Sequence, residues 1–189
     1  IGYNEIFRKS IHVLSAIIPL SHIYLFKEKI DMILFLSLML IFCFFIEEAR
    51  NIPKTNRVFK KYLYFMMRNF EKKGNLTGAT WVFVGSLFSI ILVPNPFCII
   101  ALFFLSVGDT FAAIIGIKYP YFKIGKKTLS GSLACFISCL GVCLIFNQIL
   151  DIEILIFGAL VASIAELISF NINDNVSIPL FSGCSMYIV

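Results

Sequence analysis

Two carboxylic acids lie inside long apolar stretches of this chain. Asp109 falls within Phe-Leu-Ser-Val-Gly-Asp-Thr-Phe-Ala-Ala, and Glu166 within Leu-Val-Ala-Ser-Ile-Ala-Glu-Leu-Ile. An ionisable side chain is costly in an apolar environment, so both residues are candidates for metal binding or proton transfer. For Asp109 the alternative is a structural hydrogen bond between helices. Gly116 shares the helical face of Asp109, where small residues allow a neighbouring helix or a ligand to approach closely.

A basic loop follows the stretch that contains Asp109. It reads Gly125-Lys126-Lys127-Thr128 and precedes Gly131 at the start of the next apolar stretch. A glycine, two lysines and a helix N-terminus suit a phosphate or another anion. The loop is not a Walker A motif, because eight residues separate Gly116 from Gly125 and that motif has four. Consecutive lysines on a helix would point about 100° apart, so this site requires an extended loop. The alternative is an ordinary basic loop at a membrane surface.

Two further groups of polar residues are weaker candidates for a functional site. Asp174 and Asn175 lie in Asn-Ile-Asn-Asp-Asn, which could hold a hydrated cation or form a simple polar turn. Arg8, Lys9 and His12 precede the first apolar stretch, where basic residues also serve as membrane anchors. Mg²⁺ typically takes one or two protein carboxylates plus phosphate oxygens. The four groups together therefore predict a metal–polyphosphate site.

The elements that position these residues must lie in a bilayer. Apolar residues make up 59% of the 189 positions and charged residues only 14%, whereas a soluble domain of this size has roughly 25% charged residues. Barrel-type alternation is absent. We therefore expect one all-α domain over residues 1–189, a polytopic transmembrane helical bundle of six to seven spans. The spans are predicted near 11–26, 31–46, 76–93, 97–117, 131–148 and 152–170, with a partial span at 176–189.

The basic residues are distributed unevenly over the loops. Apart from Lys27 and Lys29, 14 of the 16 lysines and arginines fall on alternate loops, which places them on one side. By the positive-inside rule that side is cytoplasmic. We expect an integral multi-pass protein whose N-terminus and active site are cytoplasmic, in the cell membrane of a prokaryote or the endoplasmic reticulum of a eukaryote. The expected surroundings are those of the lipid bilayer, with no nucleic-acid partner.

Four motifs in this order resemble the membrane CTP-dependent lipid kinases, which include dolichol kinase, phytol kinase and CTP-dependent diacylglycerol kinase. They are Arg8-Lys9-x-x-His12, Gly108-Asp109-x-x-Ala112-x-x-x-Gly116, Gly125-Lys126-Lys127-Thr128-x-x-Gly131-Ser132, and Glu166-x-x-Ser169 followed by Asp174-Asn175-x-x-Ile178-Pro179-Leu180. The resemblance runs from about residue 8 to 180. The chain departs from the family pattern at Ile117, Pro120 and Ser130.

The resemblance implies transfer of the γ-phosphate of CTP to the hydroxyl of a polyprenol, a phytol-like alcohol or diacylglycerol, with Mg²⁺ as the cofactor. Asp109, Asp174 and Glu166 would be catalytic, and Asp109 and Asp174 would hold the metal. Asp174 could instead be the base for the lipid hydroxyl, and Glu166 competes for both roles. The implied nucleotide-binding residues are Arg8, Lys9, His12, Gly116, Gly125, Lys126, Lys127, Thr128, Gly131 and Asn175.

Two other classes share part of the pattern. CTP:phosphatidate cytidylyltransferases also have an aspartate-bearing span followed by a Lys-Lys-Thr loop. They carry a late motif with Lys-Arg, His-Gly-Gly and Asp-Arg, whereas this chain has Asp174-Asn175 there. An ion- or proton-coupled transporter could use Asp109 and Glu166 as ion sites, but the chain lacks the inverted repeats common in transporters.

Overall fold

The computed structural model describes residues 12–52, 67, 71–168 and 172–189. The protein is mostly helical. Its α-helices are α2 (Ile17–Tyr24), α3 (Lys29–Asn51), α5 (Gly78–Leu92), α6 (Phe97–Phe103), α7 (Asp109–Lys118), α8 (Leu129–Phe146), α9 (Ile152–Leu167) and α10 (Asp174–Ile188). A 3₁₀ turn, η1 (Glu71–Lys73), precedes α5, and a π-helical segment, η2 (Phe104–Gly108), joins α6 to α7.

Three helices are long and apolar enough to cross a membrane: Lys29–Arg50, Phe97–Lys118 and Leu129–Phe146. They coincide with three of the predicted spans. Two shorter apolar helices, His12–Tyr24 and Gly78–Leu92, coincide with two more. The apolar helices support a membrane protein, while the total of six to seven spans stays a prediction.

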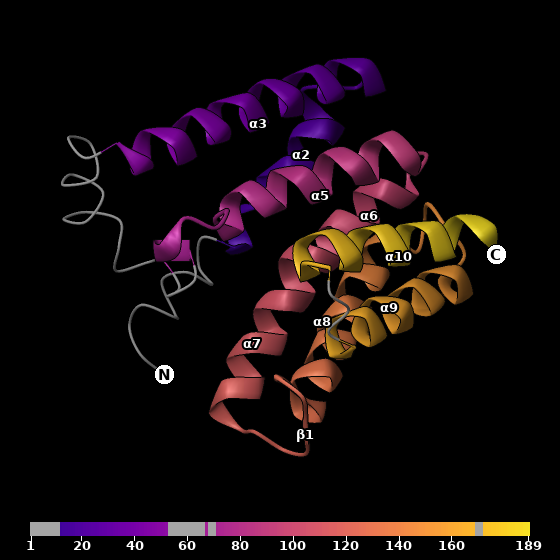
Figure 1. Ribbon diagram of the computed structural model, residues 1–189. Helices are drawn as coiled ribbons and strands as arrows, with labels where there is room; N and C mark the ends of the chain where they lie inside the picture. The colour runs from indigo at the N-terminus through magenta and orange to yellow at the C-terminus, as the bar shows by residue number, and fades with distance from the viewer. Residues whose placement is uncertain (1–11, 53–66, 68–70, 169–171) are drawn as a thin grey trace.

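The helices do not pack in chain order. α3 packs along α5, and α5 packs against α10, which also lies along α9. α9 in turn contacts α8, and α8 contacts α7 (Figure 1). The last helix of the chain therefore lies between α5 and α9, which brings its N-terminus close to residues from the middle of the sequence.

Cysteines pack the centre of the bundle. Cys135, Cys139 and Cys143 are free and buried at one-turn intervals along α8. A Cβ atom added to Gly108 would lie 2.8 Å from the Cys135 sulfur and 2.9 Å from the Cys139 sulfur. These thiols therefore act as small apolar side chains that let η2 approach α8 closely.

A π-helical segment ends directly before Asp109. η2 widens the helix over Phe104–Gly108, and the α-helical geometry resumes at Asp109. A π-turn rotates the side chains that follow it relative to an uninterrupted α-helix, and such turns often occur at functional sites. The face on which Asp109 lies thus depends on η2.

A two-stranded hairpin connects α7 to α8. β1 (Lys123–Ile124) pairs antiparallel with β2 (Lys127–Thr128), with Ile124 opposite Lys127. Gly125 occupies the first central position of the turn with φ +58°, a conformation that favours glycine. The predicted extended conformation of this loop is confirmed, and the hairpin is a small β element within the otherwise helical structure described here.

Candidate active site

The side chain of Lys127 links three elements of the bundle. Its Nζ atom lies 2.8 Å from Oε1 of Glu166, in the last turn of α9. It also lies 2.6 Å from Oδ2 of Asp174, the first residue of α10. Because β2 runs directly into α8, the hairpin reaches across to the ends of two helices that come later in the chain. Three of the residues selected from the sequence therefore meet at one point.

The two carboxylates around Lys127 differ in exposure. The Glu166 side chain is 5% exposed, and its second oxygen accepts a hydrogen bond from Ser132 Oγ at 2.6 Å. The Asp174 side chain is 29% exposed. Glu166 is therefore fixed on both oxygens, whereas Asp174 is the carboxylate of this pair that a ligand can reach.

His12 links Asp109 to the N-terminus of α10. Its Nε2 atom lies 3.3 Å from Oδ2 of Asp109 and 2.9 Å from Oδ1 of Asn175. The Asn175 amide nitrogen donates to the Gly78 carbonyl at 3.1 Å, which directs the Asn175 oxygen toward His12. With an acceptor on each side, Nε2 of His12 carries the proton. This chain of contacts connects α5, α7 and α10.

The carboxylates of the cluster act on the pKa of Lys127. Burial alone would lower the pKa of Lys127, but the charges of Asp174, Glu166 and Asp109 outweigh it and raise the pKa above its ordinary value. Lys127 therefore stays protonated at physiological pH. Two carboxylates, Glu166 and Asp174, contact this ammonium group, and the charge of Asp109 acts on it as well.

The predicted glycines and Thr128 build the close contact between α7 and α8. A Cβ atom at Gly116 would lie 2.7 Å from Thr128 Oγ1, and one at Gly131 would lie 2.8 Å from the Ala112 carbonyl oxygen. Thr128 caps α8, since its hydroxyl accepts from the Gly131 N–H at 3.1 Å. These contacts bring Asp109 and the hairpin together. Contact of these three residues with a nucleotide stays a prediction.

The structure separates the two consecutive lysines. Lys127 points into the carboxylate cluster, whereas Lys126 is exposed in the hairpin turn beside Gly125. Arg8 and Lys9 lie outside the described residues. Ser132 received no role from the sequence. Its position four residues after Thr128, in the first turn of α8, is the signal that places it near the loop.

The donor chemistry of the cluster fits Mg²⁺. Among the residues that the structure describes, no group of three or more His, Cys, Asp or Glu side chains is close enough to enclose a metal ion. Mg²⁺ does not require such an enclosure, because it usually keeps waters and phosphate oxygens beside one or two carboxylates. Asp109 and Asp174 supply carboxylates of this kind.

Comparisons with known proteins point to one enzyme class. The chain is 29% identical over 163 residues to CTP-dependent diacylglycerol kinase 1 of Saccharomyces cerevisiae, covering 72% of this chain and 56% of the yeast protein. It is 27% identical over 205 residues to a probable chloroplastic phytol kinase 1 of Oryza sativa subsp. japonica, covering 96% and 63%. An uncharacterised protein of Rickettsia prowazekii is 28% identical over 182 residues, covering 92% and 88%.

No protein-family profile matches the chain, and no solved structure matches it significantly. The named relatives support membership of the CTP-dependent lipid kinase family. They also support a phosphotransferase that acts on a lipid.

Proposed function

We propose that this protein is a CTP-dependent kinase that transfers the γ-phosphate to the hydroxyl of a membrane lipid alcohol. The observation that supports this most is the position of Lys127, which lies between Glu166 and Asp174 within a cluster that also contains Asp109. Phosphoryl transfer depends mainly on positioning and on charge neutralisation, and this cluster offers both. CTP as the donor rests on the names of the kinase relatives.

Lys127 has the central binding role in this proposal. In the structure its ammonium group neutralises Glu166 and Asp174. The same group offers a point charge to the polyphosphate of CTP, as lysines commonly do. Lys126, which is exposed, would contribute at most a screened charge from the turn.

The carboxylates divide into binding and positioning roles. Asp109 and Asp174 would hold Mg²⁺, which supplies charge neutralisation at the phosphates when bound. Glu166 positions Lys127, because both of its oxygens are engaged by Lys127 and Ser132. His12 and Asn175 position Asp109 by the contacts described above. Asp174, the more exposed carboxylate, is also the better placed to accept the proton of the lipid hydroxyl.

The site's place in the membrane follows from the same proposal. Lys127 lies two residues before the start of α8, which is long enough to cross a bilayer. With the basic loops on the cytoplasmic side, the cluster would face the cytoplasm at headgroup depth. CTP would reach it from water, while the hydrocarbon part of the alcohol stays in the bilayer.

The direct test is a transfer assay with [γ-³²P]CTP and Mg²⁺ on the purified protein. Polyprenol, phytol and diacylglycerol are supplied separately in mixed micelles, and the lipid extracts are resolved by chromatography. The proposal predicts label in one or more of these alcohols, at a rate that falls on chelation of Mg²⁺.

The cytidylyltransferase alternative gives a different product in a parallel assay. There, with phosphatidate supplied, label from [α-³²P]CTP would appear in the CDP-diacylglycerol product, while label from [γ-³²P]CTP would appear in diphosphate. Absence of lipid-bound γ-label together with this result would overturn the kinase proposal.

A further inference from the structure

The hairpin between α7 and α8 has two faces with different surroundings. Lys127 lies on the face toward the carboxylate cluster. The rest of the connection carries exposed aromatic and basic side chains, which we call its outer face. They are Tyr119, Tyr121, Phe122, Lys118, Lys123 and Lys126. Tyr121 and Phe122 are 70% and 67% exposed, so most of each side chain is left uncovered by the protein.

The two neighbouring helices fix where this face lies. The segment Phe97–Lys118 and the helix Leu129–Phe146 are both long and apolar enough to cross a bilayer. Only residues 119–128 connect them. Figure 1 shows this connection at the far end of α7 and α8. A connection this short between two spans lies at the membrane surface.

The chemistry of the outer face fits that location. Aromatic rings with polar groups and lysines with long apolar stems are favoured at the boundary between headgroups and acyl chains. The stretch 118–127 contains four lysines and no acidic residue. Basic residues near an anionic membrane surface are attracted to it. The occupant that these features select is therefore the interfacial layer of a bilayer that contains anionic lipids.

The backbone at Phe122 gives independent support. Phe122 has φ +45°, in the left-handed region that a bulky side chain rarely adopts. Such a conformation is unfavourable and persists where the surroundings require it. Within the protein the exposed ring of Phe122 gains little in return, whereas burial of the ring in lipid would offset this cost.

We infer that the outer face of the 118–126 hairpin inserts its aromatic side chains into the interfacial layer of an anionic bilayer. Tyr119, Tyr121 and Phe122 supply the inserted rings, and Lys118, Lys123 and Lys126 bind the lipid phosphates. This contact fixes the depth of the loop that carries Lys127. The inference requires no particular reaction, so it stands or falls separately from the kinase proposal.

The test places a fluorescent reporter at the tip of the hairpin. Trp81 is the only tryptophan, so Phe122→Trp in a Trp81→Phe background reports from one position. The protein is placed in nanodiscs of phosphatidylcholine, with or without phosphatidylglycerol, whose acyl chains carry bromine near the headgroup or near the chain end. We expect a blue-shifted emission and a loss of fluorescence that is larger with the shallow bromine. Iodide should quench little.

Two matched variants sharpen the result. Leu38→Trp in the same background reports from an exposed position in the middle of α3 and should be quenched more by the deep bromine. Replacing Lys118, Lys123 and Lys126 together by glutamine should remove the additional quenching that phosphatidylglycerol produces. Emission typical of water with full iodide access would overturn the inference. So would a blue shift without bromine quenching that depends on protein concentration, because a second copy would then cover the hairpin.

Discussion

Two clusters in this protein combine buried carboxylates with a basic side chain, and they differ in kind. In one, Glu47 and Arg50 of α3 form an ion pair with 2.9 Å between Oε2 and Nη2, and their side chains are only 8% and 4% exposed. In the other, Lys127 lies among Glu166, Asp174 and Asp109. Both clusters include a carboxylate that is almost fully buried. Burial therefore does not distinguish a structural cluster from a functional one.

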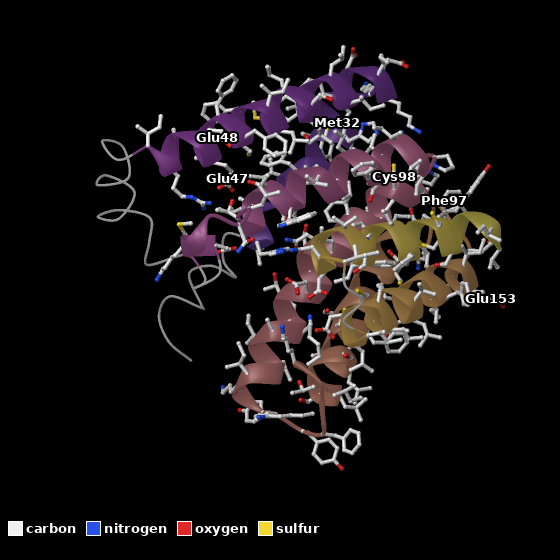
Figure 2. All side chains as sticks on the ribbon, in the orientation of Figure 1. Met32, Glu47, Glu48, Phe97, Cys98 and Glu153 are labelled. Carbon is white, nitrogen blue, oxygen red and sulfur yellow. The ribbon has the colours of Figure 1, made fainter. Side chains whose placement is uncertain are left out.

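The difference lies in the partners and in the exposure of the carboxylates. Glu47 accepts hydrogen bonds from the Thr77 N–H at 2.7 Å and the Thr80 hydroxyl at 2.9 Å, at the N-terminus of α5. Arg50 donates to the Asn75 carbonyl at 3.0 Å. Figure 2 shows Glu47 on the side of α3 that faces α5. One carboxylate matched by one guanidinium, with backbone groups and the Thr80 hydroxyl as the other partners, attaches α3 to α5. In the Lys127 cluster one ammonium group instead contacts two carboxylates, and the Asp174 side chain is 29% exposed.

Asp109→Asn is expected to have the largest effect. The amide keeps the shape of the side chain but removes its charge, so metal binding and the contact with His12 both weaken. We expect kcat to fall by about 10³-fold or more, equivalent to about 4 kcal/mol. The measurement is [γ-³²P]CTP transfer by protein that elutes as a single species in detergent. Asp151→Asn, at the exposed start of α9, is the control, and near-normal turnover by Asp109→Asn would contradict the metal assignment.

Arg50→Met tests the structural cluster. The substitution leaves Glu47 buried without its charged partner, which typically costs about 3 kcal/mol or more. We expect a marked drop in the thermal unfolding temperature, while kcat per folded molecule stays near that of the natural sequence. Glu48→Gln changes the exposed neighbour of Glu47 and should leave both quantities unchanged. A large loss of kcat in folded Arg50→Met protein would remove the distinction between the two clusters.

Lys127→Ala and Lys126→Ala compare the two faces of the hairpin. We expect Lys127→Ala to lower kcat/KM for CTP by about 10²-fold, equivalent to about 2.7 kcal/mol, because it removes a charge at the phosphates. Lys126→Ala should change kcat/KM only slightly, since exposed charges are screened. Equal losses in the two variants would show that both lysines act on the nucleotide.

Metal binding distinguishes Lys127→Ala from Lys126→Ala without an activity measurement. Removing the ammonium group leaves Glu166 and Asp174 without their common partner, so Lys127→Ala should bind a divalent cation more tightly in the absence of nucleotide. Electron paramagnetic resonance of Mn²⁺ measures the free ion directly. We expect a lower Kd for Mn²⁺ in Lys127→Ala than in Lys126→Ala. An unchanged Kd would mean that these carboxylates do not serve as cation ligands.

Thr128→Ala should have the smallest effect. Thr128 caps α8 through the Gly131 N–H, and loss of such a cap costs about 1 kcal/mol. Thermal unfolding should show this loss, and Thr128→Ser should restore the stability because serine also caps helices. A loss of CTP affinity at unchanged stability would instead support the predicted contact with the nucleotide.

The sequence alone indicated that the chain lies in a membrane, and it indicated where most of the helices are. A chain with 59% apolar and 14% charged residues cannot cover a soluble surface. Apolar stretches and their basic or polar boundaries placed helices close to α3, α5, α8 and α9. The sequence also singled out Asp109 and Glu166, because a charged residue within an apolar stretch is costly wherever the chain folds. It singled out Lys127 as part of a glycine–lysine loop before a helix, and Asp174 as part of a polar Asn-Asp-Asn turn.

Only the tertiary structure decided which of these residues meet. Lys126 and Lys127 are equivalent in the sequence, and the register of the hairpin directs only Lys127 to Glu166 and Asp174. Likewise, the placement of α10 between α5 and α9 brings Asn175 to His12, 163 positions away. Local patterns carry no information on such contacts, because helix packing depends on side chains that are distant in the chain. Ser132 and Glu47 acquire their roles in the same way, through partners that only the folded bundle supplies.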